Sequence, residues 1–334
     1  MGAITHQPRP LSLVIPTWNG GPRFLELLDV LDQQDVPGGF QLVVVDSTSR
    51  DGTPEAARQR GALVHQIPQS EFGHGKTRNL GLSLAAGRVV ALLTQDALPM
   101  DRHYLRVLEE AFADESIDGA YARQFPQPDC DPILAERLRR WSASRDSFVV
   151  QELVPGDAEA SRRKYDGLEP MQRLMACAFD SVASAVRKST WQRIPYPDVR
   201  FGEDVAWGKE VLLAGGRIAF EPRARVEHSH PLDIKREFKR LYCDHKNLYR
   251  LFGVRNVPTW GHAWRGWKPQ SKYYAELIDS QGGLSEAEKR RWKRLGHWHA
   301  LFEASAQFLG ARSWWKCQQS AFWRWFDRRI QRGV

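Results

Sequence analysis

The segment RVVALLTQDALP, residues 88–99, runs from an apolar stretch into three polar residues and ends at a proline. Its first half has the length and composition of a buried β-strand. Its second half places Thr94, Gln95 and one carboxylate, Asp96, directly after that strand. An acid in this position either caps the following helix or acts as a ligand at the mouth of a sheet. The segments on either side decide between these roles.

The first third of the chain alternates short apolar segments with segments of helical period. Strands are predicted at 11–15, 42–45, 62–67 and 88–93, and helices at 23–34, 54–60 and 76–86. This alternation predicts an α/β fold, in which a mostly parallel sheet has helices on both faces. In such sheets, ligands bind beyond the carboxyl ends of the strands.

Polar residues follow three of the predicted strands. The sequences after them are PTWN at 16–19, DSTSRDGT at 46–53 and TQDALP at 94–99. Because the carboxyl ends of parallel strands lie at one edge of a sheet, these segments are expected to line one crevice. Taken singly, Asn19, Asp46, Asp51 and Asp96 are also good turn formers and helix caps. Together they favour a binding site.

Charge and tryptophan are distributed unevenly along the chain. Residues 233–334 contain 21 Lys and Arg against 9 Asp and Glu, a net charge of +12, so the total of +8 leaves −4 for residues 1–232. Nine of the thirteen tryptophans lie between positions 260 and 325. A basic, Trp-rich segment is typical of proteins that contact a membrane surface or a polyanion.

The cysteines and the hydropathy pattern indicate a cytoplasmic protein. The four cysteines, at 130, 177, 243 and 317, form no CxxC pair, so neither a zinc site nor a disulfide framework is indicated and a reducing compartment is favoured. No apolar leader follows Met1, and no apolar run approaches the ~18 residues of a membrane-spanning helix.

Five segments, in this order, resemble the motifs of family 2 inverting glycosyltransferases of the GT-A fold, and most of all those of the bacterial rhamnosyltransferases. They are VIPTWNG (14–20), VVVDSTSRDGT (43–53), HGKTRNLG (74–81), TQDALP (94–99) and FGEDVAWGKEVLLAGGRIAFEPRARVEHSH (201–230). The resemblance covers residues 11–250. It implies an enzyme that transfers a sugar from a nucleoside diphosphate to an acceptor hydroxyl, with inversion at the anomeric carbon.

The resemblance assigns the first strand ends to the nucleoside of the donor. Pro16, Thr17 and Asn19 are expected around the nucleoside, and Asp46 against the base. A carboxylate there accepts a hydrogen bond from the N3–H that uracil and thymine share, so the base stays open between the two. Asp51 belongs to the same group of donor-binding residues.

The segment EFGHGKTRN, residues 71–79, has a competing interpretation as the end of a P-loop. Ser70 stands where that motif requires its first glycine, which argues against it. What remains is a glycine-containing loop before a helix, with Lys76 and Arg78 near the helix N-terminus, a favourable place for a diphosphate. The resemblance puts Arg78 and Asn79 at the donor pocket. The alternative is a solvated first helical turn.

The resemblance also implies a metal site. The family's Asp-x-Asp signature, aligned on Pro99, puts Thr94 at the first aspartate and Asp96 at the second, so Asp96 is the expected ligand of Mn²⁺ or Mg²⁺. Thr94 and Gln95 are expected to contact the donor. His228 is the expected second ligand, which favours Mn²⁺. A histidine bonded only to backbone is the alternative, more so for His230.

Inversion by direct displacement requires a base that deprotonates the acceptor hydroxyl. The resemblance makes Asp204 this base and Glu203 its neighbour, which orients it or contacts the acceptor. Acidic residues also stabilise the first turn of a helix, so a plain helix start is the alternative.

The expected domains are a GT-A domain at 1–250 and a basic, Trp-rich helical extension at 251–334. Within the first, 11–123 is the nucleotide-binding half and 124–250 the acceptor and catalytic half. A helix is expected at 133–141, and the polar stretch 154–170 is expected to be a mobile loop. Its Arg162, Arg163 and Lys164 are expected to be solvated, with contact to an acceptor diphosphate as the alternative. The extension is expected to bind a membrane surface through interfacial helices, with packing on the domain as the alternative.

The expected reaction moves L-rhamnose from dTDP-L-rhamnose to a lipid-linked or saccharide acceptor in bacterial surface polysaccharide synthesis, at the inner face of the cell membrane. A UDP-hexose donor, or a catalytically inactive GT-A-like binding module, are the alternatives. A nucleic-acid partner is not expected, because the positive charge is confined to the last third and no recognition motif is present.

Overall fold

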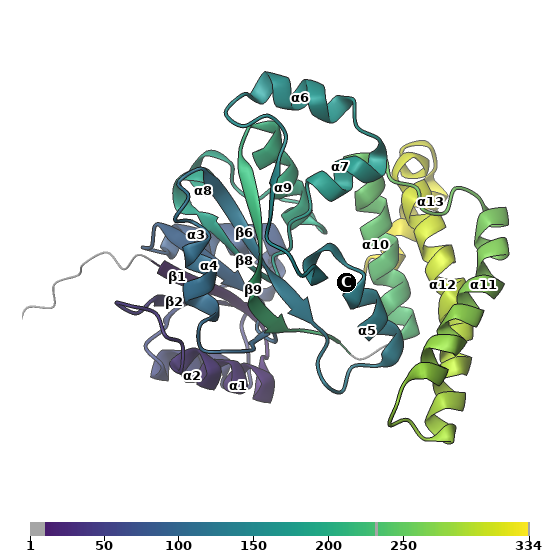
Figure 1. Cartoon of the computed structure of the whole chain (residues 1–334), viewed down its shortest axis with the longest axis horizontal. Helices are drawn as coiled ribbons and strands as arrows, with labels where there is room; N and C mark the ends of the chain where they lie inside the picture. Colours follow the sequence, from purple (N-terminus) through teal and green to yellow (C-terminus); the bar gives the residue numbers. More distant parts are fainter. Residues whose placement is uncertain (1–10, 231–232, 333–334) are drawn as a thin grey trace, which may run out of the picture. The chain divides into compact units, whose positions relative to one another are not determined.

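The computed structural model describes residues 11–230 and 233–332, which divide into two compact units (Figure 1). Unit 1 comprises Met1–Gln127, Arg140–Leu168 and Met175–His228. Unit 2 comprises Pro128–Arg139, Glu169–Leu174 and Ser229–Val334. Two short segments from the middle of the chain therefore belong with its C-terminal part.

A mixed sheet of nine strands forms the centre of the described part of unit 1. The strand order is β3-β2-β1-β4-β8-β6-β9-β5, with β7 paired to β9. The strands are β1 Leu11–Thr17, β2 Gln41–Asp46, β3 Leu63–Gln66, β4 Val89–Leu93, β5 Leu98–Pro99, β6 Ile117–Phe125, β7 Val149–Glu152, β8 Ala183–Arg187 and β9 Arg217–Glu227. The first four are parallel to one another, as the alternating sequence predicts. Strand β8 runs antiparallel to both β4 and β6, which makes the sheet mixed.

Helices pack on both faces of this sheet. Leu11, Leu13 and Ile15 of β1 belong to one core cluster with apolar residues of α1 (Gly21–Asp32), α2 (Thr53–Gln59) and α4 (Tyr104–Glu110). Val14 points to the opposite face, because side chains alternate along a strand. There Gly81 of α3 (His74–Leu84) lies so close that a Cβ on it would be 2.2 Å from Val14 Cγ1. The expected α/β fold is confirmed.

The remaining helices of the chain's middle part connect the later strands. They are α6 Ala158–Asp166, α7 Pro170–Ala176, α8 Lys188–Arg193, α9 Glu203–Leu213 and the 3₁₀ turn η2 Ser142–Ser144. Another 3₁₀ turn, η1 Gln69–Glu71, lies between β3 and α3. The expectation of a loop at 154–170 is wrong over α6. Asp157 caps this helix by accepting from the Ala160 N–H, and Arg163 pairs with Glu159 one turn away. Lys164 donates to the Leu153 carbonyl at 2.8 Å, so it is not simply solvated.

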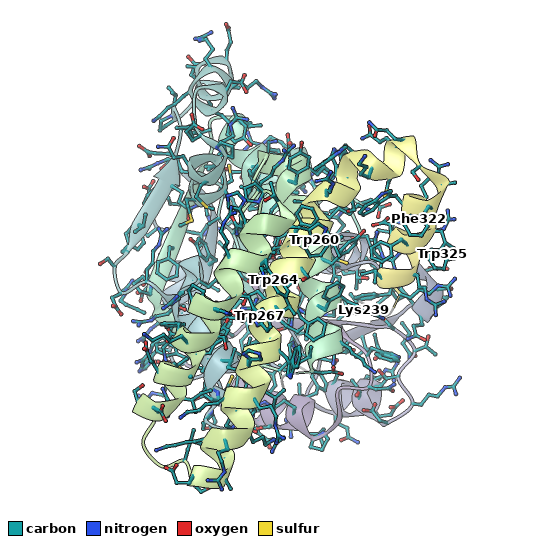
Figure 2. All side chains as sticks on the ribbon, turned by 90° about the vertical axis from the view of Figure 1, so that its right-hand side faces the viewer. Lys239, Trp260, Trp264, Trp267, Phe322 and Trp325 are labelled. Carbon is teal, nitrogen blue, oxygen red and sulfur yellow. The ribbon has the colours of Figure 1, made fainter. Side chains whose placement is uncertain are left out.

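The described part of unit 2 is helical, as the expected extension requires, and Figure 2 shows its side chains. Its helices are α5 Pro132–Arg139, α10 Ile234–Phe252, α11 Trp260–Ser280, α12 Glu286–Gln319 and α13 Ala321–Ile330. A small core joins Ile133 of α5, Tyr274 of α11 and Ala300 of α12. Among the described residues, no helix is both long enough and apolar enough to cross a membrane.

Helices α10 and α12 approach each other closely at Gly310. A Cβ on Gly310 would lie 2.3 Å from the backbone oxygen of Tyr242, so only glycine fits without movement of a helix. Gly266 in α11 is exposed, and a Cβ on it would meet no atom within 4 Å. The two glycines therefore provide a matched pair of helix-interior sites.

We expect Gly310→Ala to lower the melting temperature, because overpacking costs about 1–3 kcal/mol and here the obstacle is backbone. Gly266→Ala is expected to raise it, because alanine is favoured over glycine by about 1 kcal/mol within a helix. Thermal unfolding followed by circular dichroism measures both. Equal effects of the two substitutions would contradict the close approach of α10 and α12.

Candidate functional site

The loops that follow β1 and β2 are hydrogen-bonded into one frame. The Asn19 N–H donates to Ser49 Oγ at 2.7 Å, and Asn19 Oδ1 accepts from the Arg50 N–H at 2.9 Å. Asp51 Oδ2 accepts from the Gly21 N–H at 2.9 Å. Asn19 and Asp51 thus hold the backbone of the facing loop. We call these two loops, residues 17–21 and 46–53, the loop frame.

The charge of Asp51 stabilises this frame. Partial desolvation raises the pKa of Asp51, but hydrogen bonds from the Thr53 hydroxyl and from the backbone N–H groups of Gly21 and Thr53 outweigh it. The resulting pKa lies below the ordinary value for aspartate. The carboxylate therefore stays ionised at neutral pH and keeps its hydrogen bonds.

Asp46 is fully buried at the end of β2. Its Oδ1 accepts from the hydroxyls of Thr17 at 2.9 Å and Ser49 at 2.5 Å. Its Oδ2 accepts from the Ser49 N–H at 2.9 Å and from Gln66 Nε2 at 3.4 Å. The bond from Gln66 is the longest, so it is the one that a base N–H would displace most easily. Pro16 precedes Thr17 in β1 and is partly buried.

Gln95 connects the end of β4 to the loop frame. Its Oε1 accepts from the Trp18 N–H at 2.8 Å and its Nε2 donates to the Trp18 carbonyl at 3.2 Å. Trp18 belongs to the loop frame and was not among the residues predicted to bind a ligand. It is 49% exposed. The Thr94 hydroxyl is buried and has no hydrogen-bond partner among the residues that the structure describes. A polar atom in that state is a place where a ligand group would gain a hydrogen bond.

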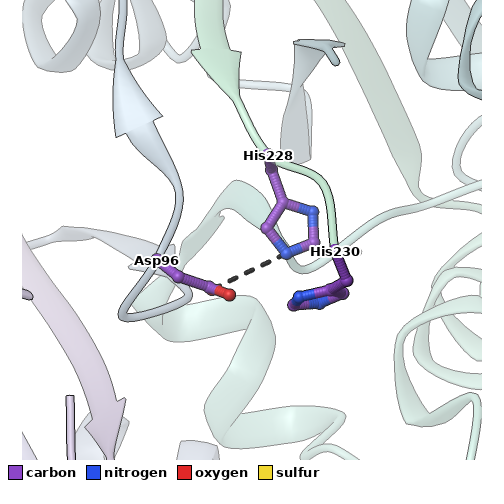
Figure 3. A group of neighbouring side chains, drawn as sticks. All are labelled: Asp96, His228 and His230. Atoms are coloured by element: carbon purple, nitrogen blue, oxygen red, sulfur yellow. Dashed lines mark ion pairs between the residues drawn. The ribbon is translucent and has the colours of Figure 1, made fainter. Parts of the chain in front are cut away.

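Asp96 and His228 are held together by strand pairing. Leu98 of β5 pairs with Glu227 of β9, and the His228 N–H donates to the Phe125 carbonyl at 2.9 Å. As a result, His228 Nε2 lies 3.6 Å from Asp96 Oδ1 (Figure 3). His228 is buried.

These residues fit a divalent cation. One carboxylate oxygen of Asp96 and one ring nitrogen each of His228 and His230 lie within 4.8 Å of one another. His230 follows His228 by two positions, so the chain itself keeps the two histidines near each other. Six ligands at about 2.2 Å from an ion are about 3 Å from their neighbours, a spacing that this group reaches with small movements. Imidazole with carboxylate suits Mn²⁺ better than Mg²⁺, which prefers oxygen alone.

Arg78 of α3 and Glu203 of α9 form a buried ion pair. Both side chains are 7% exposed, and Arg78 also donates to the Ser181 carbonyl at 3.4 Å. Desolvation lowers the pKa of Arg78, but the Glu203 carboxylate more than compensates and the pKa is raised. Arg78 therefore engages Glu203 and fixes the start of α9 against α3.

Asp204 is the neighbouring carboxyl group and is partly buried. Its Oδ2 accepts from the Ser181 N–H at 3.2 Å and its Oδ1 from the Val205 N–H at 2.8 Å. Burial and the negative charges of Glu203 and Asp180 raise the pKa of Asp204 to about 8, against the opposing effect of Arg78. A carboxyl group with a pKa near neutral is suited to general base catalysis.

The segment Asp180–Val182 links these parts, and its role was not predicted from the sequence. The Val182 carbonyl accepts from the Thr94 N–H at 2.9 Å, while Ser181 contacts both Arg78 and Asp204. Asp180 accepts from Trp141 Nε1 at 3.0 Å and from the Val182 N–H at 2.9 Å. The only sequence signal was a single acid just before an apolar strand.

Asn79 and Lys76 are placed differently from one another. Asn79 holds the segment before α9: its Nδ2 donates to the Tyr196 carbonyl at 2.8 Å, and its Oδ1 accepts from Trp191 Nε1 at 2.8 Å. Lys76 is 60% exposed and pairs with exposed Asp198 at 3.1 Å. The amide group of Asn79 is therefore hydrogen-bonded within the protein, whereas the ammonium group of Lys76 is accessible to solvent.

The chain matches the model of the family "Glycosyl transferase family 2" over residues 12–155. It is 30% identical over 236 residues to the O-antigen chain rhamnosyltransferase RfbN of Salmonella typhimurium, which is 70% of each chain. It is 25% identical over 277 residues to N-acetylglucosaminyl-diphospho-decaprenol L-rhamnosyltransferase of Mycobacterium tuberculosis, 75% of this chain and 86% of that one. Residues 1–349 of Staphylococcus aureus TarS in complex with UDP have a similar fold, with a TM-score of 0.51 at 18% identity over 94% of this chain and 93% of that one.

We expect Asp96→Ala and His228→Ala each to weaken binding of Mn²⁺ at least about tenfold, because each removes a ligand from the site. Titration calorimetry with Mn²⁺ alone measures this, and His65→Ala, an exposed histidine on β3, is the control. Unchanged affinity in both variants would exclude this pair as the metal site.

We expect the Asp204 carboxyl group to titrate near pH 8, as followed by NMR of protein labelled with ¹³C at the aspartate carboxyl groups. Asp180→Asn is expected to lower that midpoint, because it removes a negative charge that opposes ionisation. The variant Asp204→Asn identifies the Asp204 resonance. Asp29→Asn, at an exposed aspartate of α1, serves as the matched control. A midpoint that stays fixed in Asp180→Asn would contradict the coupling.

Proposed function

Because the chain belongs to glycosyl transferase family 2, and is a glycosyltransferase of the GT-A fold, we propose that it transfers L-rhamnose from dTDP-L-rhamnose with inversion at the anomeric carbon. The acceptor is lipid-linked or a saccharide, and the product is part of a bacterial surface polysaccharide. The names of the two rhamnosyltransferase relatives support the sugar, and the diphospho-decaprenol in one name supports a lipid-linked acceptor.

The observation that carries the proposal is the Asp204 carboxyl group beside the buried Arg78–Glu203 pair. Asp204 takes the proton of the acceptor hydroxyl as the new glycosidic bond forms. Its raised pKa matches this task, because a base works best when its pKa lies near the working pH. Glu203 does not face the acceptor as a second base, since Arg78 engages its carboxylate, and it acts by positioning Asp204.

The loop frame binds the nucleoside of the donor. Pro16, Thr17 and Asn19 surround it, and Asp46 accepts from the base N3–H once Gln66 releases Oδ2. Asp51 and Gln95 hold the frame in shape through the backbone of Gly21 and Trp18. Preorganised loops of this kind reduce the entropy lost on binding.

The polar groups around the diphosphate complete the donor site. Asp96 and His228, with His230 next to them, hold a Mn²⁺ or Mg²⁺ ion, which supplies positive charge for the leaving diphosphate. The accessible Lys76 adds a second positive charge, and the buried Thr94 hydroxyl forms a hydrogen bond with the nucleotide sugar. Asn79 acts one step away, by fixing the segment before α9.

We place the enzyme on the inner face of the cell membrane, where nucleotide sugars and lipid-linked acceptors meet. The basic, aromatic composition of the last third of the chain supports this location.

We expect turnover with dTDP-L-rhamnose to exceed turnover with UDP-glucose, UDP-galactose and GDP-mannose on one acceptor. A pocket that distinguishes a methyl from a hydroxymethyl group contributes only about 1–3 kcal/mol, so some cross-reaction is expected. Higher turnover with a UDP-hexose would refute the rhamnose assignment and leave the fold and the base unaffected.

For the base, Asp204→Asn is expected to slow transfer by about 10²–10⁴ with little change in donor affinity. Glu210→Gln, an exposed acid on the same helix α9, is the matched control and keeps the wild-type rate. Transfer by Asp204→Asn at the wild-type rate would remove Asp204 from the mechanism.

A further inference from the structure

One side of helix α13 is held by contacts with α10 within unit 2. The Asp327 carboxylate is buried and accepts from the Tyr242 hydroxyl at 2.9 Å and from Lys246 Nζ at 2.7 Å. The Phe326 ring meets Tyr242 edge-on, with centroids 6.0 Å apart. These contacts with α10 set the rotation of α13 about its axis.

The opposite side of α13 exposes large aromatic side chains. Phe322 is 64% exposed and Trp325 is 52% exposed. Arg329 lies over the Trp325 ring at 6.0 Å from the centroid. Positions 322, 325 and 329 share one helix face, so this face combines two aromatic rings with a cation.

Helix α11 carries a second group of exposed tryptophans. Trp264 is 65% exposed and Trp260, one turn earlier, is 52% exposed. Trp267 donates from Nε1 to the His297 carbonyl of α12. Its ring packs against that of Trp264, with centroids 5.1 Å apart, and so anchors the group. Figure 2 shows Trp260, Trp264 and Trp267 along α11 and Phe322 and Trp325 on α13, with Lys239 between the two groups in this view.

The charge around these aromatics is positive. Residues 260–275 of α11 include Arg265, Lys268 and Lys272 and no Asp or Glu. In α13 the single acid, Asp327, is turned inward, whereas Arg328 and Arg329 are exposed. Two copies of such a face repel each other, so its partner is a surface of opposite charge. Tryptophan and basic residues together are typical of helices that lie at the interface of a bilayer.

Helix α12 behaves differently from the expectation for the whole extension. Eight of its 34 residues are buried: Gly296, His299, Ala300, Ala306, Phe308, Gly310, Ala311 and Ser313. Helix α12 combines a buried face with three exposed aromatic residues, Trp298, Phe302 and Trp314. Among the described residues of unit 2, the large aromatic side chains that are more than half exposed are Trp260 and Trp264 of α11 and Phe322 and Trp325 of α13.

We propose that Trp260 and Trp264 of α11, with Phe322 and Trp325 of α13, form an anchor that inserts into the interface of an anionic phospholipid membrane. The exposed Arg and Lys of the same helices attract the negative headgroups. The anchor rests on the proposed function only in that a lipid-linked acceptor explains why a glycosyltransferase would bind a membrane.

The test is flotation of the full chain with vesicles of phosphatidylcholine alone or mixed with phosphatidylglycerol. We expect partitioning onto the anionic vesicles to exceed that onto the neutral ones at least about tenfold and to weaken with added salt. The triple variant Trp264→Ser, Phe322→Ser and Trp325→Ser is expected to lose at least about tenfold of this binding. Leu25→Ser with Phe148→Ser, two exposed apolar residues of unit 1, is the matched control and keeps it.

A second variant tests the charge without removing apolar surface. Arg328→Glu with Arg329→Glu is expected to weaken binding to anionic vesicles and to leave the weak binding to neutral vesicles unchanged. Melting by circular dichroism checks that each variant is folded, and it requires neither donor binding nor sugar transfer. The vesicle result therefore stands or falls independently of the donor and of the reaction.

Equal vesicle binding by the triple variant and the wild type would overturn the proposal. So would equal binding of the wild type to neutral and anionic vesicles. If light scattering shows a dimer that the triple variant loses, and vesicles bind neither protein, the aromatic face binds a second copy of the chain and the membrane anchor is refuted.

Discussion

The buried ion pair between Arg78 and Glu203 is the interaction on which the proposed catalytic part of the molecule depends. Removing either partner would leave a charge in a region with little solvent, at a cost of about 3–5 kcal/mol. The pair fixes the start of α9, where Glu203 directly precedes Asp204. Burial and the negative charges of Glu203 and Asp180 raise the pKa of Asp204 to about 8, and the positive charge of Arg78 opposes this rise. The same contact thus provides rigidity and moderates the pKa of Asp204, the proposed base.

The proposed donor side of unit 1 follows a related rule, in which side chains satisfy the backbone of loops that are distant in sequence. Asn19, Asp51 and Gln95 each bond backbone groups of another strand's loop, and Asp46 gathers four donors in a fully buried position. Such loops would otherwise carry unpaired backbone groups at the edge of the sheet. The segment Asp180–Val182 then ties this region, through Thr94, to Ser181 and the base. The proposed donor side and Asp204, the proposed base, are therefore joined by hydrogen bonds within unit 1.

In unit 2, buried polar contacts decide which aromatic residues are core. Asp327 needs Tyr242 and Lys246 as partners once it is buried, and this requirement turns Phe322 and Trp325 outward. Composition alone does not distinguish a packed helical bundle from an interfacial helix, because both can contain the same number of tryptophans. The exposure of Phe322 and Trp325 depends on contacts of Asp327 with Tyr242 and Lys246, which lie more than 80 residues away in the chain.

The sequence by itself determined the secondary structure of the first third, the polar strand ends, the family and the uneven charge. Hydrophobic period depends on neighbours within four residues, so β1 to β4 and α1 to α3 lie within two residues of their predicted bounds. The tertiary structure decided the partners: Gln95 with Trp18 is separated by 77 residues and Arg78 with Glu203 by 125. Local pattern carries no information on such pairs, and this is why the role of Asp180 was not predicted. Helix α6 was missed for a different reason: its cap at Asp157 and its Glu159–Arg163 pair are local, but its polar composition indicated a loop. Where a side chain can be buried only with a particular distant partner, its role follows from the packing of the whole chain.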